Sequence, residues 1–570
     1  METTDVTKKK MITGSEAVIL SLINEGVDVL FGYPGGAIMP VYDAMHDYYD
    51  KLNHILTRHE QGALHAAQGY ARVTGRVGVS IVTSGPGATN AVTGIADAMI
   101  DSTPLVVISG QVASGLLGTD AFQETDVVGI TQPITKWNYQ IKTAEEIPEA
   151  IAKAFYIAKS GRPGPVLLDI TKDAQFGKFD YEYKKIDFIR SYRPLPETDL
   201  SKIDEAARLI NLSKKPFALI GQGVILGNAE KEVLEFVEKG DIPFATTLLG
   251  LSAVPTDHPL NMGMPGMHGH YAPNVKTNDA DLIIAIGMRF DDRVTGNLDK
   301  YAKKAKIIHL DIDPAEVNKN IYADVPILGD VKYTLPLITE KISKTSHEDW
   351  IKEFRALINV ETQKIINKQI NPTEEGMLMG EVIHKVSEAF GHDAIMVTDV
   401  GQHQMMGARY FKFKQSRSVV TSGGLGTMGF GLPAAIGAKM GKPDRPVVLF
   451  VGDGGFQMTI QELGTIFQSN IPVKVVLLNN GFLGMVRQWQ ELFFDKRYAM
   501  TELINPDFQT ICKGYHMPSE LVDSRDKLDK AVKNLVEADG PYLIEVVVEK
   551  EGNVFPMVPA GASVSDVRLE

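Results

Sequence analysis

Two apolar segments separated by a helical one constrain this chain most. Residues 447–451 read VVLFV, and residues 473–478 are apolar apart from one lysine. Such runs are typical of strands with both faces buried, as in a parallel sheet. Residues 458–469 between them have helical spacing and are long enough for a right-handed crossover. Both strands would then end at one edge of the sheet, followed by Asp453 and Asn480, and open α/β folds bind ligands at that edge.

The residues at this edge suit a magnesium diphosphate. Mg²⁺ prefers oxygen ligands and usually takes only one or two from protein carboxylates. Gly452 and Gly454 let the backbone approach phosphate oxygens, and a helix starting here favours an anion at its first amides. Taken alone, Asp453-Gly454 and Asn480-Gly481 are each typical of an ordinary turn. The pair at this spacing favours a ligand site, and residues 482–493 continue with helical spacing, which argues against a hairpin.

Composition excludes several classes of protein. The chain of 570 residues corresponds to roughly three to four domains. Its charge of -13 is spread along the sequence, which argues against nucleic acid or an anionic membrane as partner. Its one cysteine excludes an internal disulfide framework and suits a reducing cytoplasm. No apolar run reaches the roughly 18 residues of a membrane span, and the polar start shows no targeting peptide, so we expect a cytoplasmic protein.

Further strand patterns predict three doubly wound parallel α/β domains. Residues 29–31, 55–57, 77–82, 105–108 and 166–170 predict strands of a domain over 1–190. After a proline-containing linker at 192–196, strands at 217–220, 282–286 and 307–310 predict a second domain over 191–370. Asn371-Pro372 marks the start of the third domain, 371–570, which contains the opening segment.

Several loops carry candidate functional residues, each with an alternative. Glu60 stands at a strand-to-helix junction, where a glutamate can also simply complement the helix dipole. Arg289 and Arg293 follow a strand together with two aspartates, which suits an anionic ligand or a self-satisfied salt-bridge cluster. Residues 221–227 miss the dinucleotide-binding pattern, so they do not indicate NAD. The pair His268 and His270 lacks further ligands at zinc spacing.

The GDG at 452–454 followed by NN at 479–480 resembles the cofactor motif of thiamine diphosphate-dependent enzymes. Other segments extend the resemblance over residues 11–560, to the catalytic subunit of the acetohydroxyacid synthase (acetolactate synthase) family. They are RHEQGALHAAQGYAR at 58–72, TSGPGATN at 83–90, GTDAFQE at 118–124, GRPGPVLLDITKD at 161–173, RFDDRVTGN at 289–297, DIDPAEVNK at 311–319 and GMVRQWQELFF at 484–494. The family's domain order is pyrimidine-binding, FAD-binding and diphosphate-binding, which agrees with three α/β domains.

The resemblance implies specific roles at the cofactor. Asp453, Asn480 and the carbonyl of Phe482 would hold Mg²⁺ on the diphosphate. Glu60 would contact the aminopyrimidine and promote deprotonation of the thiazolium, while Met428 would support the folded cofactor from below. Further cofactor contacts would come from Tyr33, Pro34, Gly36, Pro86, Asn90, Val400, Gly401, Gln402, His403, Gly426, Gly452, Gly454, Met458 and Met485.

The resemblance also implies a flavin site and an acceptor site. FAD would contact Arg162, His268, Gly287, Arg289, Arg293, Asp311 and Asp330, and would be structural because the net reaction transfers no electrons. Gln123, Lys172, Phe122 and Gly36 would surround the second 2-keto acid, and Trp489 would form the wall that meets its extra methyl group.

The implied function is the first common step of branched-chain amino acid biosynthesis. Pyruvate would be decarboxylated and joined to a second pyruvate or to 2-ketobutyrate, giving 2-acetolactate or 2-aceto-2-hydroxybutyrate. A homodimer or higher homo-oligomer with sites between two chains, and a small regulatory subunit, would complete the enzyme. The alternatives are a pyruvate oxidase-type flavoenzyme and an FAD-free catabolic acetolactate synthase. The RFDDRVTGN segment argues against the second and Trp489 against both, while Glu60 argues against a glyoxylate carboligase. The intact set of Glu60, Asp453 and Asn480 argues against a non-catalytic flavin- or nucleotide-binding protein.

Overall fold

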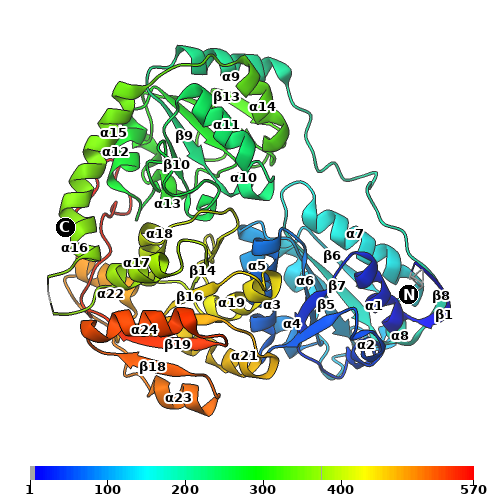
Figure 1. Cartoon of the computed structure of the whole chain (residues 1–570). Helices are drawn as coiled ribbons and strands as arrows, with labels where there is room; N and C mark the ends of the chain where they lie inside the picture. Colours follow the sequence, from blue (N-terminus) through cyan, green and yellow to red (C-terminus); the bar gives the residue numbers. More distant parts are fainter. Residues whose placement is uncertain (1–6, 374) are drawn as a thin grey trace.

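Three parallel sheets organise the chain in the computed structural model, which describes residues 7–373 and 375–570 (Figure 1). The first sheet has strand order β3-β2-β4-β5-β7-β6 and all its strands are parallel. Its strands are β2 (Val29–Gly32), β3 (Asn53–Leu56), β4 (Gly78–Val82), β5 (Leu105–Gln111), β6 (Trp137–Ile141) and β7 (Pro165–Thr171). The helices of this domain are α1 (Gly14–Asn24), α2 (Met39–Met45), α3 (Glu60–Thr74), α4 (Pro86–Asn90), α5 (Val92–Ile100), α6 (Val127–Thr131), α7 (Ile147–Lys159) and α8 (Lys172–Phe176). A separate antiparallel pair, β1 (Lys8–Thr13) with β8 (Lys178–Glu182), joins the two ends of the domain.

The central domain is built on a parallel sheet of order β10-β9-β11-β12-β13. Its strands are β9 (Pro216–Ile220), β10 (Phe244–Thr246), β11 (Leu282–Ile286), β12 (Lys306–Asp311) and β13 (Val325–Leu328). Its helices are α9 (Leu200–Leu212), α10 (Gln222–Leu226), α11 (Glu230–Gly240), α12 (Tyr271–Asp279), α13 (Asp292–Thr295), α14 (Val331–Lys341), α15 (Glu348–Glu361) and α16 (Asn367–Ile370).

The C-terminal domain carries the third parallel sheet, of order β15-β14-β16-β17-β19-β18. Its strands are β14 (Ile395–Thr398), β15 (Val419–Val420), β16 (Val447–Gly452), β17 (Lys474–Asn479), β18 (Ser519–Val522) and β19 (Tyr542–Val547). Its helices are α17 (Met379–Ala389), α18 (Gln402–Tyr410), α19 (Gly431–Gly441), α20 (Asp453–Met458), α21 (Leu463–Ser469), α22 (Gly484–Phe493), α23 (Phe508–Gly514) and α24 (Arg525–Glu537). The three sheets fall within the three predicted ranges, and the predicted α/β fold class is confirmed.

The apolar runs form strands because both faces of the sheets are buried. In β16, Val447, Leu449 and Val451 belong to one apolar cluster, while Val448 and Phe450 belong to another on the opposite face. The same alternation occurs in the first sheet, so neither face of either sheet tolerates a polar stripe. This explains why β16 is apolar from Val447 to Val451 instead of alternating.

One predicted element differs in the structure. The expected single helix over 458–469 is divided into the end of α20, a short 3-10 turn (Ile460–Glu462) and α21, and Thr459, between α20 and the turn, has a non-helical backbone conformation (φ -134°, ψ 24°). The hydroxyl of Thr459 donates a hydrogen bond of 2.9 Å to the carbonyl of Gly429. This tertiary contact outweighs the local helical spacing and ends α20 at Met458.

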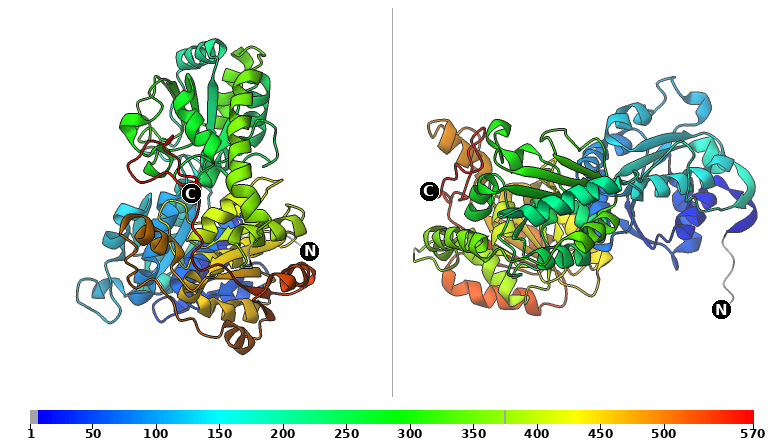
Figure 2. Two further views of the ribbon diagram at one scale, coloured as in Figure 1. Left: turned by 90° about the vertical axis from the view of Figure 1, so that its left-hand side faces the viewer. Right: turned by 90° about the horizontal axis from the view of Figure 1, so that it is seen from above.

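The first and third domains share one core. Helix α3 packs closely on α19, where a Cβ atom on Gly69 would lie 2.0 Å from the carbonyl oxygen of Ala434. One apolar cluster spans residues of both sheets. The chain after β19 then returns to the central domain, as the dark red segment of Figure 2 shows. There the amide of Val558 bonds the carbonyl of Met267, and Val564 is buried in the central core.

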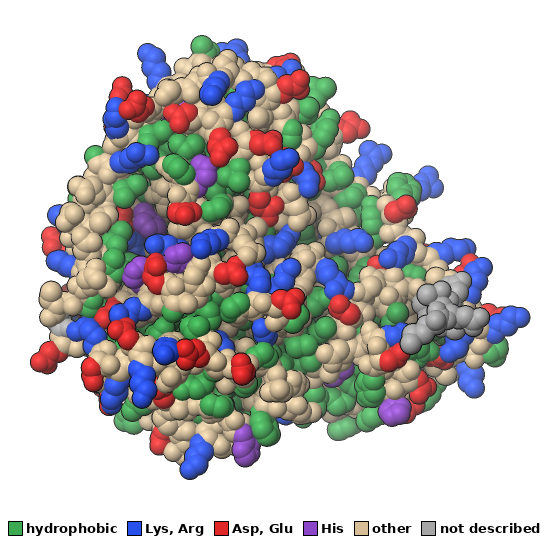
Figure 3. All heavy atoms as spheres, in the orientation of Figure 1, with side chains coloured by type: hydrophobic (Ala, Val, Ile, Leu, Met, Phe, Trp, Pro, Cys, Tyr) green, Lys and Arg blue, Asp and Glu red, His purple; other side chains and the backbone are tan. Residues whose placement is uncertain are grey.

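Charged side chains are spread over the surface, as their spread along the sequence predicts. Acidic and basic side chains are interspersed over the face drawn in Figure 3, with no large area of a single sign. The one cysteine, Cys512, is buried, and burial raises the pKa of its thiol to about 11, which agrees with an inert core residue. Among the described residues, none of the helices combines the length and apolar character required to cross a lipid bilayer.

Candidate active site

A cavity of about 1230 Å³ lies where the central and C-terminal domains meet. Its C-terminal part is lined by the segments after β14, β16 and β17, and its central part by the segments after β9, β11 and β12. All six strands present their carboxyl ends here, which is the position where parallel α/β sheets bind ligands. The end of α5 and Arg162 complete the lining from the first domain.

Asp453 and Asn480 follow the ends of β16 and β17, which are neighbouring parallel strands with Gly452 opposite Leu478. Both side chains are buried. Asn505 donates a hydrogen bond of 2.7 Å to Asp453, but burial still raises the pKa of this carboxyl. A cation in this position would favour the ionised form. Two side-chain oxygens with the neighbouring Phe482 backbone suit a Mg²⁺ ion that takes its other ligands from phosphate and water.

The groups facing this pair suit an anion. The imidazole of His403 is buried, which lowers its pKa to about 4, and among the described residues its Nε2 makes no hydrogen bond. The ring lies against the backbone of Gly401 and Gly452, where added Cβ atoms would lie 2.9 Å and 3.1 Å from it. The first turn of α18 opens on the cavity here. A buried histidine with a free ring nitrogen beside a helix start is suited to a phosphate oxygen.

Met428 stands at the end of the segment 422–428, which follows β15. It lines the cavity, with its Cε about 3.7 Å from the position that a Cβ on Gly454 would take. Trp489 lines the same part of the cavity from α22 and packs against Phe493, with the rings tilted by 40° and their centroids 4.9 Å apart. The C-terminal part thus combines a polar end at Asp453 and His403 with apolar walls at Met428 and Trp489.

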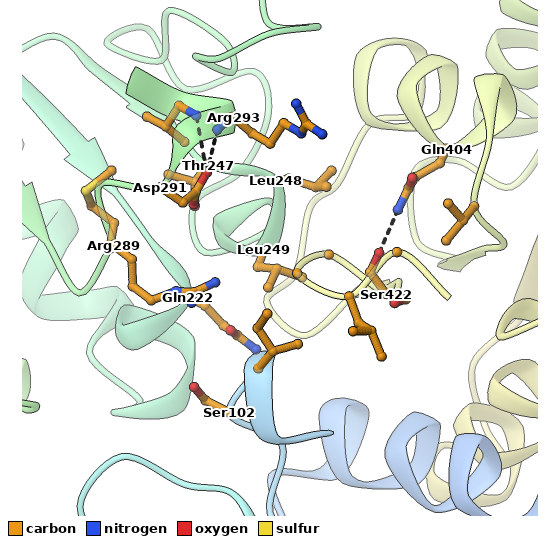
Figure 4. Close-up of a pocket in the computed structure, with 18 of the residues that line it drawn as sticks. Ser102, Gln222, Thr247, Leu248, Leu249, Arg289, Asp291, Arg293, Gln404 and Ser422 are labelled. Atoms are coloured by element: carbon orange, nitrogen blue, oxygen red, sulfur yellow. Dashed lines mark hydrogen bonds between the residues drawn. The ribbon is translucent and has the colours of Figure 1, made fainter. Parts of the chain in front are cut away.

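The central part of the cavity carries two arginines whose charges are not neutralised by a cluster. Asp291 accepts the amides of Arg293 and Val294 as the cap of α13, so it does not form a salt bridge within the expected cluster. Among the acidic groups that the structure describes, Arg293 forms an ion pair only with Asp292, at 3.5 Å, and this pair is exposed. Arg289 has neither a hydrogen bond nor an ion pair among the described residues, and Figure 4 shows it beside Gln222. The arrangement favours an anionic ligand over a self-satisfied network.

Polar groups of the central part that suit hydroxyls and phosphates surround these arginines. His268 is buried with its Nδ1 unbonded among the described residues, and its pKa is lowered to about 4 by burial. Burial raises the pKa of Asp311 to about 6 at the end of β12, and Asp330 caps α14. Arg162 donates to Ser102 at 2.8 Å and to Glu316 at 2.7 Å, which joins the first domain to this wall.

Glu60 lies elsewhere, at the start of α3. Its carboxylate is buried and accepts a hydrogen bond of 3.0 Å from Asn90, and Gly87 lies close to its other oxygen. Pro86 begins α4 beside it. The 118–124 loop packs over this point, because a Cβ on Gly85 would lie 2.8 Å from the carbonyl of Gln123. This first-domain cluster is open to solvent, with Phe122 88% exposed and Tyr33 and Lys172 also exposed.

The structure therefore divides the residues expected at the site into two groups. Those that line the cavity are Arg162, His268, Gly287, Arg289, Arg293, Asp311, Asp330, Val400, Gly401, Gln402, His403, Gly426, Met428, Gly452, Asp453, Gly454, Asn480, Phe482, Met485 and Trp489. Those outside its lining are Tyr33, Pro34, Gly36, Glu60, Pro86, Asn90, Phe122, Gln123, Lys172 and Met458, all of them among the described residues. Met458 ends α20 with 55% of its surface exposed, because Thr459 turns the chain there.

Sequence reasoning missed buried carboxylates that hold these loops. Asp399 accepts the amides of Val400, Gly429 and Gly431, and burial raises its pKa to about 6. Glu462 accepts the amide of Arg58 at 3.0 Å, next to Glu60, and burial raises its pKa to about 7. Asp399 directly follows β14, so its position at a strand end was a usable signal. Nothing local marks Glu462, whose partner is distant in sequence.

Comparison with known families agrees with this geometry. Residues 12–130 match the family described as thiamine pyrophosphate enzyme, N-terminal TPP binding domain. Residues 203–338 match the thiamine pyrophosphate enzyme central domain, and residues 399–546 match the C-terminal TPP binding domain. The fold and site therefore define a thiamine diphosphate-dependent enzyme.

Similar curated proteins narrow the class further. The acetolactate synthase large subunit of Corynebacterium glutamicum is 48% identical over 98% of this chain and 90% of its own length. That of Lactococcus lactis is 46% identical over 97% of this chain and 95% of its own. The acetolactate synthase isozyme 2 large subunit of Escherichia coli is 43% identical over 98% of this chain and 99% of its own length. The chain belongs to the acetolactate synthase large-subunit family.

Proposed function

We propose that this chain is the catalytic subunit of an acetolactate synthase, which decarboxylates pyruvate and joins the remaining two-carbon unit to pyruvate or 2-ketobutyrate. The products, 2-acetolactate and 2-aceto-2-hydroxybutyrate, begin branched-chain amino acid biosynthesis. The observation that carries the proposal is the juxtaposition of Asp453, Asn480 and His403 at one sheet edge, within a chain of this family.

Bound thiamine diphosphate supplies the carbanion-stabilising chemistry that both halves of the reaction need. The residues of this chain hold and orient it. In the proposed arrangement Asp453, Asn480 and the Phe482 carbonyl hold Mg²⁺ on the diphosphate, and His403 donates to a phosphate oxygen. Met428 supports the thiazolium from the adjacent wall, and Glu60 holds a proton at the aminopyrimidine.

We assign the central part of the cavity to FAD. Arg289 and Arg293, which form no buried salt bridge among the described residues, offer guanidinium groups to its diphosphate, while Asp311 and Asp330 offer carboxylates to hydroxyl groups. The flavin would stabilise the interface between the central and C-terminal domains. It would take no part in electron transfer, because the reaction is not a net oxidation.

Two copies of the chain are proposed to form each site. The cluster around Glu60 lies outside the lining of the cavity that contains Asp453, and Phe122 beside it is largely exposed. A second copy that brings its first-domain cluster to the Asp453 cavity would cover this exposed surface and complete the site. The homodimer is thus the smallest unit that contains every group of the proposed site. A small regulatory subunit is also expected, because the relatives are large subunits.

A direct assay tests the proposal. Purified protein incubated with pyruvate, Mg²⁺ and thiamine diphosphate is expected to form acetolactate, and omission of thiamine diphosphate should abolish product. Pyruvate-dependent reduction of the flavin in every turnover would instead assign an oxidase.

Removing one arginine should weaken the flavin site. Arg293→Ala is expected to raise the Kd for FAD by about 10-fold, the order of one charge-assisted hydrogen bond. Fluorescence titration of flavin-stripped protein measures this, with Arg190→Ala as the matched control, since Arg190 is an exposed arginine just before the interdomain linker. Oxygen consumption should remain absent in both variants, and an unchanged Kd would remove Arg293 from the site.

Acceptor choice should depend on Trp489. An apolar contact with one extra methylene gives about 10- to 200-fold discrimination. Trp489→Leu is therefore expected to retain acetolactate formation from pyruvate alone, but to lower the preference for 2-ketobutyrate by about 10-fold. Competition between both acceptors measures the product ratio. The same ratio in a folded, active variant would place Trp489 outside the specificity pocket.

A further inference from the structure

Two buried aspartates of the first domain hold the segment that carries Met428. Asp97 lies in α5 and Asp101 directly follows this helix, and both are 0% exposed. Their partners lie in residues 422–427 of the C-terminal domain, more than 300 positions later. This contact joins two domains at the wall of the cavity.

The hydrogen bonds to this segment are numerous and specific. Asp101 accepts the amides of Gly423 and Gly424 at 2.8 Å and 2.7 Å, one on each carboxylate oxygen. Asp97 accepts the hydroxyl of Thr427 at 2.8 Å and also the hydroxyl of Ser422, all through its Oδ1. Charged acceptors form stronger hydrogen bonds than neutral ones, and burial strengthens them further.

Arg72 completes this aspartate clamp, which we define as Asp97, Asp101 and Arg72. Its guanidinium forms an ion pair of 2.8 Å with Asp101, and it also lies 5.6 Å from the ring centroid of Phe430. The clamp therefore contacts the chain on both sides of Met428. Because two carboxylates are buried and Arg72, among the described residues, pairs with only Asp101, the arrangement costs desolvation free energy that a purely apolar contact would not require.

Residues of the central and C-terminal domains also contact segment 422–428. Gln404 of α18 donates to the carbonyl of Ser422 at 3.0 Å, as Figure 4 shows. Leu249 of the central domain lies against Gly423, where a Cβ would approach its Cγ to 2.7 Å. All three domains therefore contact segment 422–428, whose residues 424–426 stay exposed at the cavity, and the clamp is the polar contact from the first domain.

We propose that Asp97 and Asp101 are positioning residues for the reaction, which fix segment 422–428 so that Met428 is presented to the thiazolium of the cofactor. This inference rests on the proposed function. The clamp does not touch the Asp453, Asn480 and His403 groups that would hold the diphosphate. It should consequently govern how the bound cofactor is activated, and not how tightly it is bound.

The decisive readout is the exchange of the C2 proton of bound thiamine diphosphate for deuterium, measured in the holoenzyme by quenched-flow and NMR. Asp97→Asn is expected to slow this exchange and kcat by about 10-fold, since small misplacements at a site carry large kinetic effects. The Kd for thiamine diphosphate should change by less than about 3-fold, because its anchoring groups are untouched.

Thr427→Val removes only the hydroxyl that Asp97 accepts and leaves both carboxylates in place. It should slow exchange in the same direction, and adding it to Asp97→Asn should slow exchange less than the product of the two single effects, since both changes remove one shared hydrogen bond. Asp28→Asn is the matched control, an exposed aspartate of the same domain paired with Arg76, and should leave exchange unchanged.

Unchanged exchange in both Asp97→Asn and Thr427→Val would overturn the proposal. A loss of cofactor affinity that accounts for the whole decrease would also overturn it, because it would show a structural role only. If Asp97→Asn does not fold, Thr427→Val decides alone. Failure of the wild-type enzyme to make acetolactate would instead contradict the proposed function.

Discussion

Glu60→Gln is expected to lower kcat for acetolactate formation by about 10²- to 10⁴-fold, the range for losing one proton-transferring group. The glutamine amide has the shape of the carboxylate, but it cannot accept and return a proton at the aminopyrimidine. Binding of thiamine diphosphate with Mg²⁺ should remain near the wild-type value, because the groups proposed to hold the diphosphate, Asp453, Asn480 and His403, are unchanged. Steady-state assays and calorimetric titration measure the two quantities separately.

Asp453→Ala is the complementary variant. Removing this buried carboxylate takes away one proposed Mg²⁺ ligand, so cofactor affinity should fall, and higher cofactor concentrations should restore part of the activity. The two variants together separate activation from binding. Activity near wild type in Glu60→Gln would show that another group activates the cofactor.

Mixed dimers should reveal which chain supplies each group. A heterodimer of one Glu60→Gln chain and one Asp453→Ala chain is expected to regain roughly half of the wild-type activity per dimer, although each homodimer is nearly inactive. One of its sites would receive Glu60 and Asp453 from unchanged residues of opposite chains, while the other would receive both substitutions. Differently tagged chains, co-expressed and purified through both tags, allow this measurement.

The matched control places both substitutions on one chain and pairs it with a wild-type chain. If the sites lie between chains, each site of this heterodimer receives one substitution and the dimer should be nearly inactive. If each site lies within a single chain, the opposite pattern is expected. The heterodimer with the substitutions on separate chains would be nearly inactive, and the heterodimer with a wild-type chain would keep about half of the wild-type activity. The pair of heterodimers therefore distinguishes the two arrangements without reference to protein stability.

The three sheets, and the edge at which ligands would bind, can be predicted from residue patterns alone. Apolar runs such as residues 447–451 and 282–286 form strands because both faces of a parallel sheet are buried. Once these strands are parallel, Asp453 and Asn480 must follow them at a common edge, and the GDG and NN segments mark that edge by residue type alone.

The interruption of the predicted helix and the contacts between domains depend on tertiary packing. Thr459 interrupts a segment with helical spacing because its hydroxyl bonds Gly429 in a distant loop. Local periodicity contains no information about that partner. The tertiary structure likewise placed Glu60 away from Asp453 and brought Asp97 and Asp101 to segment 422–427. These are polar contacts between residues hundreds of positions apart, and their free energy depends on shared burial, which is set by the packing of whole domains and not by neighbouring residues in the sequence.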